Sequence, residues 1–292
     1  MGTGETICND RQGIVLGLWE ITVFRSEMNR GDILLPIIKA KNYIDVYKIK
    51  SSEEDIHQMS GRHDKRITTF CNQLIEREIA PYMDDVVIDI GCGDGSFLKQ
   101  IHKGIAKGFG IVPTTEEKSR LEKEYSIQNL AFLEGLTIKL PCENEIATKV
   151  ICNGVLILLD SKEELLESLR EIRRVSRKNA IIWIGELPHV NEFAYYNKTY
   201  GDSITKWIFS ELKQKGLVAA VNASIDVLSA LFTKETLIIN PKTHFYIEPV
   251  EFSQICNEIG FEVLKYCKNI TLDSEDNVVE VPTRYNYLLR KT

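Results

Sequence analysis

The amino-acid sequence predicts an α/β fold in which a mostly parallel sheet of seven strands carries helices on both faces. Apolar runs of strand length alternate with stretches of helical period between residues 64 and 188. Two further strand patterns follow near the C-terminus, after an interruption. Strands that alternate with helices of this length are joined by right-handed crossovers, which place successive strands parallel to one another.

The first elements follow from apolar spacing and from glycine and proline positions. Residues 1–55 show no clear pattern and are interpreted as an N-terminal extension, so that the main domain covers residues 56–292. A helix is predicted from six residues that share one helical face: Ile67, Phe70, Cys71, Leu74, Ile75 and Ile79. Pro81 ends this helix.

Five strands and three helices then alternate, and their predicted bounds follow the changes of period. The strands are predicted at residues 86–90, 108–112, 129–135, 147–153 and 180–186. The helices are predicted at residues 95–105, 114–125 and 165–175.

The alternation stops at residue 188. Residues 188–250 are rich in aromatic and helical patterns and are predicted to form a helical insertion that acts as a lid. A short helix closed by Gly260 leads into a sixth strand, and residues 284–291 alternate as a seventh.

Composition limits the classes of function. The 292 residues carry a formal net charge of -6, whereas nucleic-acid binders usually present a concentrated basic face, so no nucleic-acid partner is expected. The longest apolar stretch, residues 217–232, is too short and too polar to span a bilayer. No leader pattern opens the sequence. We therefore expect a cytoplasmic protein with no membrane partner, acting alone or as a homodimer.

Cysteine usage points to a reducing compartment. The seven cysteines are odd in number and form no CxxC pair. This is typical of reduced thiols and does not indicate a disulfide framework or a zinc site. No other metal site is predicted.

The turn after the first predicted strand is the expected ligand site, because open α/β sheets bind ligands beyond the carboxyl ends of their strands. It reads G-C-G-D-G at residues 91–95. A dinucleotide site needs G-x-G-x-x-G, but here the third glycine comes one position early and Asp94 would repel a diphosphate. The turn favours a ligand without phosphate that carries an amino-acid tail, a ribose and a base.

Residues 86–101, "VVIDIGCGDGSFLKQI", resemble the first motif of class I S-adenosylmethionine-dependent methyltransferases. The segments "FLEGLTIKLP" and "VICNGVLILL" resemble the third-strand and fourth-strand motifs of that family, and "GFEVLKY" with "RYNYLLRK" resembles its closing strands. The resemblance covers about residues 64–292. It implies a Rossmann-like fold, S-adenosyl-L-methionine as cofactor and S-adenosyl-L-homocysteine as product.

The resemblance also implies roles for single residues. Four residues of the first motif would hold the methionine portion of the cofactor: Asp89, Gly91, Cys92 and Gly93. Asn153 and Gly154 would lie beside the methionine tail and the acceptor. Arg66 or His63 would meet the cofactor carboxylate.

Two positions depart from the family pattern. Val112 stands where the family usually has the acidic residue that binds the ribose, and Leu136 stands where an aspartate often contacts the adenine. Thr137 is the expected substitute near the adenine. Three residues are candidates for the ribose: Thr114, Thr115 and Glu116. A lost hydrogen bond costs about 1 kcal/mol, so these departures keep a non-catalytic binding protein as an alternative.

The acceptor site is expected under the insertion. Four tyrosines are candidate acceptor contacts: Tyr195, Tyr196, Tyr200 and Tyr246. Glu186, His189 and His244 are candidate general bases, because each follows a predicted strand or ends the insertion. The leading hypothesis is a methyltransferase that acts on a small-molecule acceptor, by O-methylation in a biosynthetic pathway. The alternatives are the non-catalytic binding protein and an NAD-dependent oxidoreductase.

Overall fold

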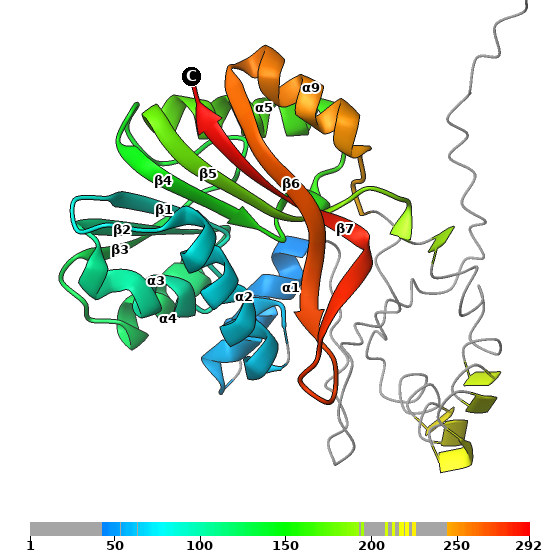
Figure 1. Cartoon of the computed structure of the whole chain (residues 1–292). Coiled ribbons are helices and arrows are strands. Elements are labelled where there is room, and N and C mark those ends of the chain that lie inside the picture. The colour runs from blue at the N-terminus through cyan, green and yellow to red at the C-terminus, as the bar shows by residue number, and fades with distance from the viewer. Residues whose placement is uncertain are drawn as a thin grey trace, which may run out of the picture.

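A seven-stranded sheet forms the centre of the molecule, with strand order β3-β2-β1-β4-β5-β7-β6 (Figure 1). The structure is a computed structural model. It describes residues 43–192 except 53 and 63, residues 194–195, scattered residues between 208 and 225, and residues 244–292. The strands are β1 (Val86–Ile90), β2 (Lys107–Val112), β3 (Leu130–Glu134), β4 (Ala147–Asn153), β5 (Ser176–Pro188), β6 (Phe261–Leu272) and β7 (Val278–Lys291).

The predicted fold class is confirmed. Strands β1 to β5 pair in parallel, and β7 runs antiparallel between β5 and β6. The last two strands are longer than their local patterns predict. Beyond the sheet they pair only with each other, for example Ile270 with Glu280, so their outer halves form a two-stranded ribbon with exposed side chains and little apolar signal.

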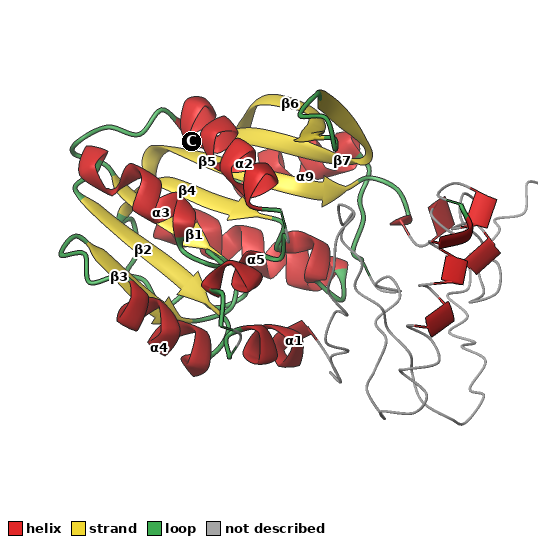
Figure 2. Cartoon of the chain, turned by 90° about the horizontal axis from the view of Figure 1, so that it is seen from below, coloured by secondary structure: helices red, strands yellow, loops and turns green. Residues whose placement is uncertain are grey.

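Helices cover both faces of the sheet, as Figure 2 shows. The described helices are α1 (Tyr43–Lys50), α2 (Lys65–Ile79), α3 (Ser96–Ile101), α4 (Thr115–Glu124), α5 (Lys162–Val175) and α9 (Pro249–Ile259), with short 3₁₀ helices η1 (Ile56–Ser60), η2 (His102–Gly104) and η3 (Leu156–Leu158).

Alternating strand residues divide the core into two clusters. Val87 and Ile151 pack with residues of α2, α3 and α4, whereas Ile88 and Val150 pack with residues of α5 and α9. Successive side chains of a strand point to opposite faces, so one apolar strand supplies both clusters.

Side-chain caps explain where the main helices begin. The side chains of Asp64, Thr114 and Ser161 each accept a hydrogen bond from a backbone N–H of the first turn of α2, α4 and α5. In α4 the residue three positions after the cap is Glu117, so Thr114 and Glu117 form a capping-box sequence.

The chain reverses its direction of winding between β1 and β4. These strands are neighbours, and Ile90 pairs with Cys152, so the turn after β1 and the residue that ends β4 lie at the same edge. Since β1 leads into α3 on one face and β4 leads towards α5 on the other, this edge is the topological switch point where ligands bind.

A segment before the main domain covers part of that edge. We call α1 and η1, residues 43–60, the cap. Lys48 pairs with Glu116 at 2.7 Å, and Figure 2 shows α1 beside α4. Most of the N-terminal extension predicted at residues 1–55 lies outside the described residues.

The insertion predicted at residues 188–250 is described only in part. Several residues between 208 and 225 are helical, and the prediction of a lid rests on residues outside the described part. In the described part of the chain, no helix combines the length and apolarity that crossing a membrane requires.

Candidate functional site

The glycine turn makes close contacts with other parts of the same chain. Gly91, Gly93 and Gly95 have φ angles of 68°, 54° and 72°, which side chains rarely adopt. A Cβ atom on Gly91 would lie 2.4 Å from Cγ2 of Val155. A Cβ atom on Gly93 would lie 2.9 Å from Cα of Ser60. Because these glycines have no side chains, the cap and the residue before η3 can lie directly against the turn. The same lack of side chains would let a ligand approach the backbone closely.

A cavity of about 50 Å³ lies against this turn. Five of the predicted cofactor residues line it: Asp89, Gly91, Cys92, Gly93 and Asn153. Ahead of β1, the prediction missed four polar residues of the lining: Ser60, Arg62, Thr68 and Asn72. They come from the cap, the link to α2 and the buried face of α2. Nothing in their spacing along the sequence distinguishes them from ordinary helix and loop residues.

Arg62 lines the cavity, and Arg66, the residue that was predicted to meet the cofactor carboxylate, does not. The Arg66 guanidinium is held by Asp64 at 2.6 Å and by Asp276 in the β6–β7 ribbon. Arg62 instead pairs with Glu186 at the end of β5. The alternative candidate, His63, lies outside the described residues.

The predicted nucleoside contacts occupy different environments. Val112 is buried at the end of β2, where it pairs with Glu134, and Thr137 is buried as well. Leu136 is 42% exposed. Gly154 has a φ angle of 69° and is not part of the cavity lining.

Asp89 is a buried carboxyl group in the cavity wall. Burial and the neighbouring carboxylate of Asp94 raise its pKa to about 8, against a smaller opposing effect of Arg62. A buried carboxyl group with a raised pKa is stabilised in its ionised form by a nearby cation. This wall is therefore suited to a positively charged part of a ligand.

A second set of buried polar groups lies between the cap and α4. Burial lowers the pKa of Lys50 to about 8 and raises that of Glu117 to about 7. Oε2 of Glu117 accepts a 2.8 Å hydrogen bond from Thr114. Sequence reasoning assigned Glu117 no role beyond helix α4, because its capping-box position already accounts for its residue type.

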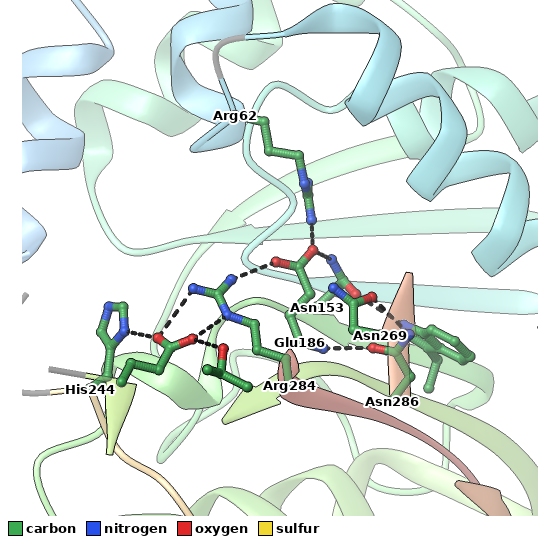
Figure 3. Close-up of polar contacts among 10 residues, drawn as sticks. Arg62, Asn153, Glu186, His244, Asn269, Arg284 and Asn286 are labelled. Carbon is green, nitrogen blue, oxygen red and sulfur yellow. Dashed lines mark hydrogen bonds and ion pairs between the residues drawn. The ribbon is translucent and has the colours of Figure 1, made fainter. Parts of the chain in front are cut away.

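Glu186 is the centre of a network that begins at the cavity (Figure 3). Its Oε1 accepts hydrogen bonds from Nδ2 of Asn153 at 2.9 Å and from Arg62, and its Oε2 accepts one from Arg284 at 3.1 Å. Burial alone would raise the pKa of Glu186, but the two guanidinium groups lower it to about 2. Glu186 was a candidate base, but in this arrangement it is ionised and already accepts three hydrogen bonds.

The network extends from Arg284 to a histidine. Nε of Arg284 donates to Oε1 of Glu192 at 2.8 Å, and Oγ1 of Thr283 donates to the same atom at 2.6 Å. The other oxygen of Glu192 contacts Nδ1 of His244, and Figure 3 shows this pair at the end of the network opposite Arg62. Burial lowers the pKa of His244, against the opposing effect of Glu192.

His189 is placed beside the last strands rather than in the network. Its Nε2 lies 3.0 Å from the carbonyl oxygen of Pro282, and its ring packs edge-on against the ring of Tyr285, with 4.9 Å between the ring centroids. Tyr195 and Tyr246, two of the predicted acceptor contacts, are 38% and 49% exposed. Tyr196 and Tyr200 lie outside the described residues. Among the described residues, no three His, Cys, Asp or Glu side chains gather as a metal site would need.

Comparison with known proteins agrees with this fold. Residues 88–184 match a family model described as "Methyltransferase domain". Among curated proteins, no significant match is found.

Three solved structures illustrate the structural similarity. An S-adenosylmethionine-dependent methyltransferase from Methanosarcina mazei is 16% identical, with a TM-score of 0.51, over 75% of this chain and 96% of that chain. The N-methyltransferase NodS from Bradyrhizobium japonicum, in complex with S-adenosyl-L-homocysteine, is 7% identical, with a TM-score of 0.54, over 86% of this chain and 99% of that chain. The [4+2]-cyclase SpnF is 12% identical, with a TM-score of 0.53, over 88% of this chain and 98% of that chain.

Proposed function

We propose that this chain, a class I S-adenosylmethionine-dependent methyltransferase by its matched domain and its fold, methylates a small organic acceptor, with oxygen as the favoured atom. One observation carries the proposal: the wall of the cavity continues into a buried polar network. Asn153 lines the cavity and donates to Glu186, so a ligand in the cavity and an acceptor beside Glu186 would be neighbours. Ion pairs with Arg62 and Arg284 leave the network without excess charge, which suits a polar acceptor of low charge.

The residues of the cavity fit S-adenosylmethionine. The Asp89 carboxyl group suits the ammonium group of the methionine portion, and the bare backbone at Gly91 and Gly93 allows close approach. Arg62 and Asn72 offer donors for its carboxylate. Ligand pockets usually measure about 300–1,000 Å³, so a cavity of about 50 Å³ accepts only part of the cofactor. Ser60 and Arg62 therefore have to move for binding.

The reaction assigns distinct tasks to the side chains. S-adenosylmethionine, when bound, supplies a methyl group that the sulfonium charge already activates. The protein has to hold the acceptor in line and remove its proton. Glu186 has a pKa of about 2, so it orients the acceptor and does not deprotonate it. We assign proton removal to His244, whose Nδ1 faces the carboxylate of Glu192.

The balance of the step is simple. The acceptor hydroxyl would give its proton to the imidazole of His244 while its oxygen bonds to the methyl carbon and the bond between that carbon and the cofactor sulfur breaks. The products are a methyl ether and S-adenosyl-L-homocysteine. We also propose that the protein acts in a biosynthetic pathway in the cytoplasm and that it can form a homodimer.

Calorimetry followed by an activity assay tests this function. The protein is titrated with S-adenosylmethionine, S-adenosylhomocysteine and NAD, and is then incubated with labelled S-adenosylmethionine and a panel of phenols, sugars and amines. Micromolar binding of the two S-adenosyl compounds, with label transferred to a hydroxyl acceptor, is the expected result. Binding of NAD alone contradicts the proposal.

A second candidate is a binding protein that transfers no methyl group. Val112 and Leu136 favour it, because neither offers the carboxylate that holds the nucleoside in related enzymes. A similar fold also occurs in a protein named as a [4+2]-cyclase, so the fold by itself does not fix the reaction. Tight S-adenosylhomocysteine binding without label transfer to any acceptor of the panel supports this candidate.

A further inference from the structure

The side chain of His57 is buried where the cap meets the glycine turn. His57 belongs to η1, and two residues further along, Met59 is fully buried. A Cβ atom on Gly93 would lie 3.0 Å from the carbonyl oxygen of Met59. This end of the cap therefore rests directly on the turn that lines the cavity.

One ring nitrogen of His57 is paired and the other is not. Nδ1 lies 2.8 Å from Oδ2 of Asp94, and both side chains are only 7% exposed. Oδ1 of Asp94 accepts a 3.0 Å hydrogen bond from the backbone N–H of Ser96. Nε2 of His57, which is buried, has no hydrogen-bond partner in the described part of the chain.

An unpaired buried polar atom is unfavourable, and its position matters here. A buried polar group without a partner has lost its hydrogen bonds to water and has gained none in their place. Two further buried atoms lack partners among the described residues, on Ser168 of α5 and on Tyr287 of β7. Tyr287 belongs to the core cluster on the opposite face of the sheet, whereas the partner of His57, Asp94, lines the cavity.

The turn residues around Asp94 face β2 and α4. A Cβ atom on Gly95 would lie 2.8 Å from the ring of Tyr125, which follows α4. A Cβ atom on Gly110 of β2 would lie 2.7 Å from Sγ of Cys92. Asn153 and the acceptor network lie on the other side, at β4. A cofactor whose reactive group points to Asn153 therefore extends its nucleoside towards β2 and α4.

That side offers the ribose few acceptors. Val112 ends β2 with an apolar side chain, and Glu117 already accepts the hydroxyl of Thr114. The Asp94 carboxylate accepts a hydrogen bond when Nδ1 of His57 carries the ring proton, and in that tautomer Nε2 has a lone pair. A hydroxyl group is the complementary donor.

We propose that Nε2 of His57 binds a ribose hydroxyl of the S-adenosyl cofactor, held in position by Asp94; the assignment rests on the proposed function. The cap thus supplies a ribose contact in place of the strand-end carboxylate that Val112 lacks.

Calorimetry with His57→Asn tests the proposal. The asparagine amide can still donate to Asp94 but lacks the second nitrogen, so the fold is expected to survive. The ligands are S-adenosylhomocysteine and its two analogues without the 2′ or the 3′ hydroxyl. We expect the variant to bind S-adenosylhomocysteine about tenfold more weakly than the wild type. The wild type should bind one of the two deoxy analogues about tenfold more weakly than it binds S-adenosylhomocysteine. His57→Asn should bind that analogue with the same affinity as the wild type does.

The matched control is Tyr287→Phe, which removes another buried atom without a partner, on the far face of the sheet. Its affinities should equal those of the wild type. If His57→Asn loses the same affinity for all three ligands, the contact is overturned. It is also overturned if the wild-type protein binds both deoxy analogues as tightly as S-adenosylhomocysteine, a result that needs no variant. Wild-type protein that binds no S-adenosylhomocysteine removes the proposed function and the contact together. Normal binding by His57→Asn removes the contact alone.

Discussion

Nδ2 of Asn153 donates a 2.9 Å hydrogen bond to Oε1 of Glu186, which ties the end of β4 to the end of β5 beside the cavity at the glycine turn. Two further contacts hold the same carboxylate. Arg62 reaches it from the link between the cap and α2, and Arg284 reaches it from β7. Four parts of the chain therefore meet at one ionised side chain, and the first predictions concern its removal.

Replacing Glu186 by Gln should destabilise the protein. The amide keeps the shape of the side chain and an acceptor for Asn153. However, the largely buried guanidinium group of Arg62 loses its counter-charge, and that of Arg284 keeps only Glu192. Breaking a buried ion pair from one side costs about 3 kcal/mol. Urea unfolding should show the loss. The exposed pair of Lys268 and Glu280 provides the control, because Glu280→Gln should leave the unfolding midpoint unchanged. Equal midpoints for both variants would contradict the buried network.

Stability should fall in acid through Glu186 and Glu192. Both carboxyl groups have a pKa of about 2 in the folded chain, below the ordinary glutamate value of 4.5. A depressed folded-state pKa contributes stability above the unfolded pKa, and the contribution disappears as pH falls from about 5 to about 2. Unfolding free energies measured across this range should decline, and the decline should be shallower in Glu186→Gln. A slope that does not change in the variant would contradict the assignment.

Gly93→Val should prevent cofactor binding while the sheet remains folded. Its Cβ atom would approach Ser60 and Met59 of the cap, and a φ angle of 54° is strained for valine. Calorimetry with S-adenosylhomocysteine should show no heat, although circular dichroism remains that of an α/β protein. Gly104→Ala is the matched control, because nothing lies within 4 Å of its Cβ position. Normal binding by Gly93→Val would mean that the cofactor lies elsewhere.

Cofactor affinity should rise with pH because of Asp89. Its folded-state pKa is about 8 in the free protein, through burial and Asp94, with Arg62 opposing. A cationic ligand beside it favours the ionised form, so binding releases a proton below about pH 8 and becomes tighter as pH rises from about 6 to 8. Titrations in buffers of different ionisation enthalpy would measure the proton. Asp89→Asn should show no such release, and release that persists in this variant would assign the proton to another group.

His244→Ala should slow methyl transfer to a hydroxyl acceptor without weakening cofactor binding. General base catalysis typically contributes about 10²–10⁴-fold, so kcat should fall within that range. Glu192→Gln should also lower kcat, because the carboxylate that faces Nδ1 of His244 is lost. His189→Gln is the comparison, since its ring nitrogen is bound to a backbone carbonyl. A larger effect at His189 than at His244 would reverse the assignment.

Sequence reasoning predicted the elements and the turn because their signals are local. The apolar run of β1, the glycines after it and the helical spacing that follows lie within sixteen consecutive residues. The five cofactor residues found in the cavity wall come from this motif and from the end of β4, whose places follow from parallel pairing. Both the fold class and that part of the candidate site were therefore accessible without coordinates.

The partners of charged side chains were not accessible in the same way. Arg62 and Arg66 stand four positions apart and look alike in the sequence, yet one contacts Glu186 and the other contacts Asp276. Arg62 and Glu186 are 124 positions apart, and Glu192 and His244 are 52 apart. No periodic pattern encodes such pairs, because an ion pair depends on the distance between two atoms in the folded chain.

The sequence by itself thus determined the order of strands and helices and the backbone conformation of the glycine turn, since these depend on residue type and short spacing. Tertiary structure alone decided which carboxyl groups are ionised and that the cap rests on Gly93. The physical reason is that burial and charge proximity, which set the pKa values of Asp89 and Glu186, exist only after distant segments have packed.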